Sequence, residues 1–322
     1  MRIVLTGAAG FIASQVAALL LDDGHEVVGI DVLNDAYDPR LKDWRLARLE
    51  ERARFTFHRT DIADREALAK VVTKAEPDAI INLAARAGVR QSVENPWVYY
   101  ETNVVGTLNL LELCKDLGVK KFVLASTSSA YGDQAEQPLR EDMQTDRPVS
   151  PYAASKKAAE VLSYTYHDLY DIDVTVFRYF TVYGAAGRPD MSVFRFIRWI
   201  DQGQPLRVFG DGTQRRDFTF VGDIARGTVA GLANVGYEIV NLGGDRPVSL
   251  LELIAIIEKT LGKKARIAFE PPNPLDVQST WADIAKARRL LGWQPQSTLE
   301  QGIEAAVEWY RANRDLALSL EM

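Results

Sequence analysis

The sequence predicts an α/β fold in which a doubly wound parallel sheet is followed by a smaller, irregular C-terminal part. Short, near-continuous apolar runs alternate with longer helical patterns in the first half of the chain, which is typical of parallel strands buried on both faces. After about Thr181 this alternation stops, and glycine and proline become frequent. We therefore expect one domain at residues 1–180 and a second at residues 181–322, with segments that cross back to the sheet.

The expected elements follow in order along the chain. Apolar runs predict strands at Ile3–Leu5, Glu26–Ile30, Phe55–His58, Ala79–Leu83, Phe122–Ala125 and Val174–Phe177. Helical patterns predict helices at Phe11–Leu21, Glu66–Ala75, Tyr99–Leu117, Tyr152–Tyr170, Leu250–Leu261, Ile284–Leu291 and Leu299–Arg314. The charged segment Asn34–Arg52 is also helix-prone, and we expect it to be solvated surface.

The composition excludes several classes of function. A net charge of −6 does not favour nucleic-acid binding, and the 322 residues are enough for a sizeable core. A single cysteine, Cys114, excludes an internal disulfide and fits a reducing compartment. The N-terminus runs directly into a strand pattern without a signal peptide, and no apolar stretch approaches the ~18 residues of a membrane span. We expect a cytoplasmic protein that binds neither membrane nor metal.

A glycine-rich turn joins the first expected strand to the first expected helix. Gly7, Gly10 and Ala13 have the spacing G-x-x-G-x-x-A, which lets a pyrophosphate approach the helix N-terminus. Asp31 ends the second strand, where its carboxylate can accept both hydroxyls of an adenosine ribose and would repel a 2′-phosphate. The turn alone is weak evidence, but its context predicts a Rossmann-type site for NAD rather than NADP. Asp61 follows the third strand and either contacts adenine or caps the next helix.

Tyr152 and Lys156 are four residues apart, so they share one face of a helix. A free tyrosine has a pKa of ~10, and a nearby ammonium together with a positive nicotinamide would lower that pKa and make the phenol a usable base. The pair alone is common in helices. It gains weight from the hydroxyl-rich run Ala125–Gly132 at the end of the fifth strand, because open α/β sheets bind ligands at the carboxyl ends of their strands.

These motifs together resemble the extended short-chain dehydrogenase/reductases, and among them the NAD-dependent nucleotide-sugar epimerases and dehydratases. The resemblance covers essentially the whole chain. It rests on Thr6-Gly7-x-x-Gly10-Phe11-Ile12, Asn82-Leu83-Ala84-Ala85, the hydroxyl run before Tyr131-Gly132, Tyr152-x-x-x-Lys156, Arg178-Tyr179-Phe180, Gly210–Phe218, Ala282-Asp283 and Leu291-Gly292-Trp293.

The resemblance implies roles for individual residues. It implies catalysis by Tyr152, Lys156 and Thr127. It implies NAD binding by Gly7, Gly10, Phe11, Ile12, Asp31, Asp61, Ile62, Leu83, Ala84, Ala85, Asn103, Tyr152, Lys156 and Tyr179. It implies substrate binding by Ser128, Ser129, Thr181, Arg188, Val208, Arg216, Asp276 and Arg90, with Arg216 on the nucleotide diphosphate. The apolar stripes on two long helices imply, in the same way, a homodimer.

Local runs indicate the sugar. Dehydratases and decarboxylases of this family resemble patterns with Asp-Glu or Ser-Glu where this chain has Ser128-Ser129, so reversible oxidation at carbon 4, as in an epimerase, remains. Hexose epimerases usually have Asn where Thr181 stands. The runs Asp31–Asp38, Ala85–Arg90, Arg178–Gly184 and Gly187–Met191 resemble UDP-glucuronate 4-epimerases. Two positions depart from that subgroup, because Ala185 replaces a proline and Leu275 a glycine.

The chemistry of a uronate fits this subgroup. Oxidation at carbon 4 makes a β-keto acid, which loses carbon dioxide when the carboxylate bond aligns with the carbonyl π-system. We hypothesise that the hydroxyls of Thr127, Ser128, Ser129 and Thr181 hold the carboxylate in an unproductive orientation, with added charge from Arg188. The alternative is that the serines only cap the strand end and the following turn.

Rival functions stay open from the sequence. The nearest is a UDP-glucose 4-epimerase, opposed mainly by Thr181 and the hydroxyl run, and a UDP-glucuronate decarboxylase is another. A non-catalytic NAD-binding protein is a reading from a different class. The complete set of Thr127, Tyr152 and Lys156 argues against it, since a pure binder needs no matched base and ammonium.

Overall fold

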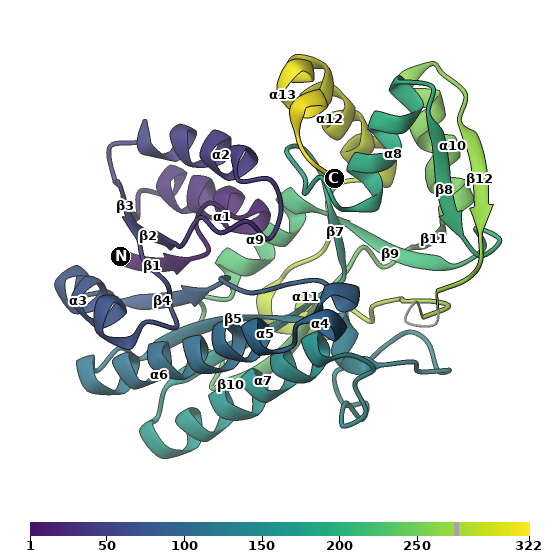
Figure 1. The fold of residues 1–322 in the computed structure, drawn as a ribbon. Coiled ribbons are helices and arrows are strands. Elements are labelled where there is room, and N and C mark those ends of the chain that lie inside the picture. Colours follow the sequence, from purple (N-terminus) through teal and green to yellow (C-terminus); the bar gives the residue numbers. More distant parts are fainter. Residues whose placement is uncertain (274–276) are drawn as a thin grey trace.

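The fold is built around a seven-stranded parallel sheet in the part of the chain that the computed structural model describes, residues 1–273 and 277–322. Its strand order across the sheet (Figure 1) is β10 (Tyr237–Leu242), β6 (Asp173–Tyr179), β5 (Lys121–Thr127), β4 (Ala79–Asn82), β1 (Arg2–Thr6), β2 (Glu26–Asp31) and β3 (Phe55–Arg59). The predicted doubly wound α/β fold and its six predicted strands are confirmed. The seventh strand, β10, comes from the C-terminal half of the chain.

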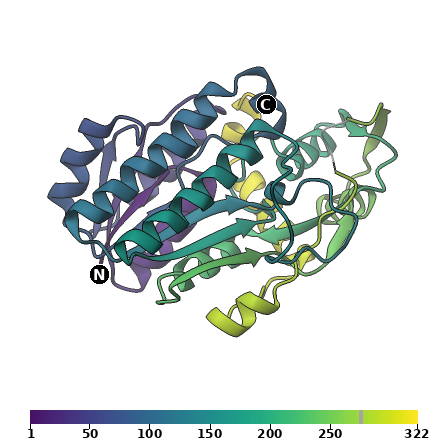
Figure 2. The ribbon, with the colours of Figure 1, turned by 90° about the horizontal axis from the view of Figure 1, so that it is seen from below.

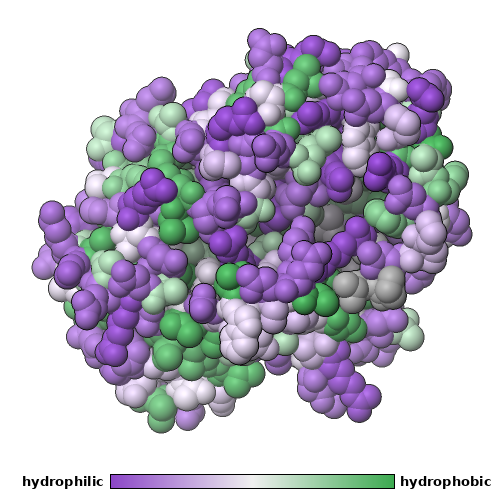
Figure 3. All heavy atoms as spheres, viewed as in Figure 1, coloured by the Kyte–Doolittle hydropathy of each residue, from purple (hydrophilic) through white to green (hydrophobic). Residues whose placement is uncertain are grey.

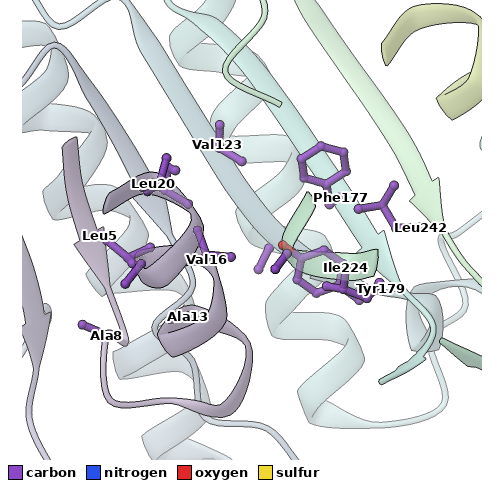
Figure 4. Packing of buried hydrophobic residues seen from close by; sticks show 14 of the residues in the cluster. Leu5, Ala8, Ala13, Val16, Leu20, Val123, Phe177, Tyr179, Ile224 and Leu242 are labelled. Atoms are coloured by element: carbon purple, nitrogen blue, oxygen red, sulfur yellow. The ribbon is translucent and has the colours of Figure 1, made fainter. Parts of the chain in front are cut away.

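Helices cover both faces of this sheet, which explains the near-continuous apolar strands. One face packs against α1 (Phe11–Asp22), α9 (Val221–Ala230) and α11 (Ala285–Leu291), and the other against α3 (Arg65–Ala75), α6 (Gly106–Leu117) and α7 (Pro151–Tyr170). Figure 2 shows α6 and α7 side by side along their face. Figure 4 shows Val16 and Leu20 of α1 near Leu5, with Ile224 of α9 beside Tyr179. Val4 points to the opposite core, so neighbouring residues of one strand are both buried.

The irregular C-terminal part has its own core. A three-stranded sheet is formed by β7 (Thr181–Tyr183), β9 (Arg215–Phe220) and β11 (Pro247–Ser249), and a strand pair by β8 (Pro205–Phe209) and β12 (Arg266–Glu270). Around them pack α8 (Ser192–Asp201), α10 (Leu250–Leu261), α12 (Leu299–Ala312) and α13 (Arg314–Ser319). Capping boxes at Ser249 and Thr298 begin α10 and α12. No helix of the described residues is long and apolar enough to cross a membrane.

The predicted helix Tyr99–Leu117 is interrupted. The chain forms α4 (Val89–Glu94), α5 (Trp97–Tyr100), a π-helical turn at Glu101–Val105 and then α6. The π-helical turn widens the helix at Asn103, whose buried amide is committed to contacts outside the helix. Apolar periodicity therefore identified the helical segment but not the change in its winding.

The expectation that Asn34–Arg52 is solvated surface is wrong. This segment contains α2 (Arg40–Glu50), which contacts α1 and buries Leu41, Leu46 and Leu49. Two charged side chains, Lys42 and Arg45, are buried with them because hydrogen bonds satisfy their cationic groups.

Candidate active site

A cleft of about 860 Å³ lies at the carboxyl ends of the central strands, between the large sheet and the C-terminal part. Figure 3 shows that this face of the molecule is hollowed between the two parts. Asp31, Thr127 and Tyr179 end β2, β5 and β6, and all three line the cleft. Residues from distant parts of the sequence therefore meet at one edge of the sheet, as strand–helix alternation predicts.

The glycine turn forms one wall of the cleft. Gly7 has a φ of 70°, and a Cβ there would lie 2.8 Å from the backbone nitrogen of Ala84, while a Cβ at Gly10 would lie 2.8 Å from the carbonyl oxygen of Gly7. Neither position has room for a side chain. Gly10 is also the N-cap of α1, so no side chain occupies the start of the helix, and the first-turn N–H groups remain available to an anion.

The two acidic residues predicted at the cofactor end both line the cleft. The buried Asp31 carboxylate accepts hydrogen bonds from the backbone N–H groups of Ala9 (3.1 Å) and Leu33 (2.8 Å), so its orientation is fixed by the turns on either side. Asp61 accepts from the N–H of Ala63 (2.9 Å), and the N-cap of α3 is instead Asp64. The helix-cap reading of Asp61 is therefore wrong. The rest of the predicted NAD set, apart from Asn103, also lines the cleft.

Asn103 is buried behind the cleft rather than on its surface. Its side-chain oxygen accepts from the N–H of Arg86 (2.9 Å), and its amide nitrogen donates to the carbonyl of Arg86 (3.0 Å) and to the Ser155 hydroxyl (2.9 Å). Ser155 lies between Tyr152 and Lys156 on α7. Asn103 therefore holds the segment after β4 against the helix that carries the predicted base.

Tyr152, Lys156 and Thr127 all line the cleft. The N-cap Ser150 and the first-turn Pro151 begin α7 just before Tyr152, which fixes where the tyrosine enters the site. Burial raises the pKa of Tyr152, while a hydrogen bond with Thr127 and the charge of Arg188 oppose that rise. Burial also lowers the pKa of Lys156 to about 8. In the protein alone, burial therefore raises the pKa of Tyr152, opposite to the lowering expected from the sequence, and the opposing charge is that of Arg188.

The hydroxyl run forms the wall next to Tyr152. Ser128, Ser129 and Thr181 are half-buried and line the cleft. The backbone N–H of Ser129 donates to the Thr127 hydroxyl (3.1 Å), so Thr127 caps the short 3₁₀-helix Ser128–Tyr131. The turn is thus capped by Thr127, while Ser128 and Ser129 line the cleft.

Four further residues predicted for substrate binding are Arg90, Val208, Arg216 and Asp276. Arg90 and Arg216 line the cleft, with Arg90 stacked on the ring of Phe209 at 4.6 Å. Val208 is buried in the C-terminal core, and its strand neighbours Arg207 and Phe209 face the cleft instead. Any role of Val208 in binding would therefore use its backbone. Asp276 lies outside the described residues.

Several cleft residues were not predicted from the sequence. Among them are Tyr37, Lys42, Arg86, Asp190 and Arg195. Burial lowers the pKa of Lys42 to about 8 although Asp31 opposes the shift, and its ammonium donates to the carbonyl (2.8 Å) and side-chain oxygen (2.7 Å) of Asn34. One signal was available: Lys42 lies on the same face of α2 as Leu46 and Leu49, and a charge on an apolar helix face calls for a partner.

Comparison with known proteins agrees with this geometry. The model of the NAD dependent epimerase/dehydratase family matches residues 3–243. A UDP-glucuronate 4-epimerase of Thermodesulfobacterium geofontis is 54% identical, over 99% of both chains. The structure of UDP-glucuronic acid 4-epimerase from Bacillus cereus with UDP-glucuronic acid and NAD has a TM-score of 0.92 at 40% identity, covering 97% of this chain and 99% of the other. UDP-glucose 4-epimerase of Thermotoga maritima gives 0.91 at 31% identity, covering 98% and 100%.

Proposed function

The chain belongs to the NAD-dependent epimerase/dehydratase family, and we propose that it interconverts UDP-glucuronate and UDP-galacturonate by inverting carbon 4 of the sugar. One observation carries the proposal: a single cleft holds Tyr152, with Thr127 and Lys156, directly beside a wall of neutral hydroxyls. The first group suits oxidation of a sugar hydroxyl, and the second suits a carboxylate at the neighbouring carbon. The 54% identical relative, itself a UDP-glucuronate 4-epimerase, supports the same activity.

In this proposal residues 1–180 hold NAD and residues 181–322 hold most of the nucleotide sugar. The glycine turn suits the cofactor because the space that a Cβ would fill at Gly7 and Gly10 is closed to side chains, and the helix start beyond it favours a pyrophosphate. Asp31 suits the adenosine ribose because its carboxylate is held in place by two backbone N–H groups. Bound NAD supplies a reversible hydride acceptor for carbon 4.

The chain's own residues then move the proton and hold the ketone. Tyr152 takes the proton of the 4-hydroxyl while the hydrogen bonded to carbon 4 leaves as hydride. Thr127 shares the hydrogen bond to the same oxygen. Lys156 and Arg188 favour the phenolate by their positive charge. The 4-keto sugar, tethered through its diphosphate near Arg216, turns over and regains hydride on its other face. Tyr152 returns the proton, so the cycle consumes nothing.

The hydroxyl wall prevents the side reaction that a 4-keto uronate invites. Ser128, Ser129 and Thr181 hold the carboxylate by hydrogen bonds that fix its orientation relative to the ketone. While the bond to the carboxylate is not aligned with the carbonyl π-orbitals, the electrons released by loss of carbon dioxide have no acceptor. The same three hydroxyls give a reason for Thr181 where hexose epimerases usually have asparagine.

The test is to incubate the purified, NAD-loaded protein with UDP-glucuronate and to follow the products by NMR. UDP-galacturonate should appear, together with a mixture of the same two sugars when the reaction starts from UDP-galacturonate. UDP-xylose or a 4-keto pentose as the main product would overturn the proposal in favour of a decarboxylase. A higher kcat/KM for UDP-glucose than for UDP-glucuronate would favour a hexose epimerase, and no turnover of either sugar a binding protein.

We further infer a homodimer formed through α6 and α7. Large apolar side chains are exposed along these helices, among them Leu108, Val161, Tyr164 and Leu169. Figure 3 shows apolar residues gathered over this part of the surface. Sedimentation should give twice the chain mass, and Val161→Glu should shift it toward the monomer, whereas Leu251→Glu at an exposed apolar site on α10 should not. The buried, reduced Cys114 also favours a cytoplasmic location.

A further inference from the structure

Tyr37, just before α2, contacts both Arg45 of α2 and Arg188 of the loop after β7. The guanidinium of Arg188 donates to both carboxylate oxygens of Asp190, at 3.0 and 2.6 Å. Its face lies over the ring of Tyr37, 5.4 Å from the ring centroid. The hydroxyl of Tyr37 in turn accepts a hydrogen bond from Arg45 at 2.7 Å. We call Tyr37, Arg45, Arg188 and Asp190 the Arg188 cluster.

Arg45 ties this cluster to both walls of the site. Its buried guanidinium donates to the carbonyl of Ala186 through two nitrogens, at 3.2 and 2.7 Å, and to the carbonyl of Ala9 at 3.2 Å. Ala9 belongs to the glycine turn, and Ala186 lies two residues before Arg188. Ala186 has a φ of 53°, a left-handed conformation that is unfavourable for alanine. Bonds to its carbonyl hold the loop in this conformation and thereby fix the start of Arg188.

Arg188 reaches the reacting end of the cleft. It lines the cleft together with Tyr152 and Thr181, and its side chain is 19% exposed. Its charge opposes the rise in the pKa of Tyr152 that burial causes, and both residues line the same cleft. Asp190 is equally accessible, with 23% of its side chain exposed. A cation that lines the same cleft as Tyr152 is therefore already paired with a carboxylate, and both side chains are partly exposed.

We propose that this cluster selects the uronate: Tyr37 and Arg45 are positioning residues for Arg188, and Asp190 holds the guanidinium until the carboxylate of the substrate shares it. The proposal rests on the proposed function. A carboxylate removed from water is costly unless charge and hydrogen bonds compensate it, whereas the hydroxymethyl group of UDP-glucose makes no such demand. Asp190 keeps the unliganded cation from standing unpaired in a half-buried site.

The test is a set of binding measurements by calorimetry, made on NAD-loaded protein in a Tyr152→Phe background so that no turnover occurs. Tyr37→Leu should weaken binding of UDP-glucuronate by about 2- to 30-fold, the range of one cation–π contact, and leave UDP-glucose binding unchanged. Tyr37→Phe keeps the ring and should retain most of the affinity. Asp190→Asn removes the competing carboxylate and should tighten UDP-glucuronate binding alone.

A matched pair of arginine variants tests whether Arg45 positions Arg188. Arg45→Met should weaken UDP-glucuronate binding more than UDP-glucose binding. Arg48→Met, one turn further along α2, should change neither, because Arg48 is exposed and contacts only Trp44 among the described interactions. Thermal midpoints measured on every variant identify any that do not fold, and the Tyr37 and Asp190 variants then decide.

The outcomes separate the two levels of the proposal. Equal losses for both sugars in Tyr37→Leu, or weaker uronate binding in Asp190→Asn, would overturn the role of the cluster while leaving the epimerase in place. A wild-type protein that binds and turns over UDP-glucose in preference to UDP-glucuronate would overturn both. A uronate-specific loss in Tyr37→Leu with a uronate-specific gain in Asp190→Asn supports the cluster, because a purely structural role predicts no such opposite changes.

Discussion

Two arginine–carboxylate pairs lie near the predicted base, and they differ in burial and in reach along the chain. Arg178 and Glu160 are each 1% exposed, and their two hydrogen bonds, at 3.0 and 2.8 Å, join β6 to α7. Ser126 of β5 donates to the same carboxylate at 2.6 Å. Arg188 and Asp190, by contrast, are two residues apart in one loop at the surface of the cleft.

The difference shows how the same chemistry serves two purposes. The Arg178 pair joins three elements behind Thr127, Tyr152 and Lys156, and its partners are fully enclosed, so it keeps the catalytic geometry fixed. The Arg188 pair has solvent on one side, so a substrate carboxylate can reach it without unfolding anything. Burial therefore assigns the first pair to architecture and the second to recognition.

We expect the largest effect on activity from a change at Tyr152, which leaves both ion pairs unchanged. Tyr152→Phe removes the hydroxyl that takes the proton and leaves both ion pairs intact, so kcat should fall by roughly 10²- to 10⁴-fold. NMR of the UDP-glucuronate to UDP-galacturonate conversion measures it, with thermal unfolding as the control for folding. Turnover near the wild-type rate would remove Tyr152 from the base role.

The next largest effect is expected when the enclosed Arg178–Glu160 pair is broken. Glu160→Gln leaves the buried Arg178 without its counter-charge, and removal of one partner of such a pair costs about 3–5 kcal/mol of unfolding free energy. Urea denaturation followed by circular dichroism measures the change. A loss under about 1 kcal/mol would show that the enclosed pair contributes no more than a surface pair and would erase the contrast.

A smaller effect concerns pH. Burial lowers the pKa of Lys156 from 10.5 in its ordinary state to about 8, and Glu160 opposes that shift. The folded protein therefore holds the ammonium below about pH 8 and loses it above, so kcat should fall roughly tenfold per pH unit on that side if the ammonium is required. Lys156→Arg should remove this limb of the profile. An unchanged limb would assign the titration to another group.

We expect the smallest change in unfolding free energy when the Arg188–Asp190 pair is broken. Asp190→Asn breaks the pair in the cleft, and since both side chains keep contact with solvent, the unfolding free energy should change by only about 0–1 kcal/mol. The same urea titration used for Glu160→Gln measures it, which makes the two variants a matched pair. A loss of several kcal/mol would show that the loop pair is as structural as the enclosed one.

Local pattern predicted much of this molecule. The alternation of apolar runs and helical stretches gave six of the strands, because a parallel strand covered on both faces must be apolar at nearly every position. The spacing of Gly7 and Gly10 located the glycine turn, which packs so close to the backbone of Ala84 that Gly7 has no room for a side chain. Tyr152 and Lys156 were found because a helix places residues four apart on one face. These features depend on neighbours within a few residues, and the sequence displays them directly.

The failures have a common physical cause. Asn34–Arg52 reads as solvated because its charges are many, yet Arg45 is buried through a bond to Ala186, 141 residues away. The π-helical turn around Asn103 is stabilised by bonds to Arg86 and Ser155, which no helical periodicity records. The side chain of Val208 faces the core because its strand alternates, and only the packed structure shows which side is the core.

The sequence by itself thus determined six of the seven strands of the large sheet, the glycine turn and the base with its lysine, since short-range spacing and apolar periodicity encode them. Tertiary structure alone decided which charges are buried and what each one faces. A buried charge is stable only with a partner, and that partner can come from anywhere in the chain. For this reason only the packing of α2 against the loop after β7 decides which residues surround Arg188.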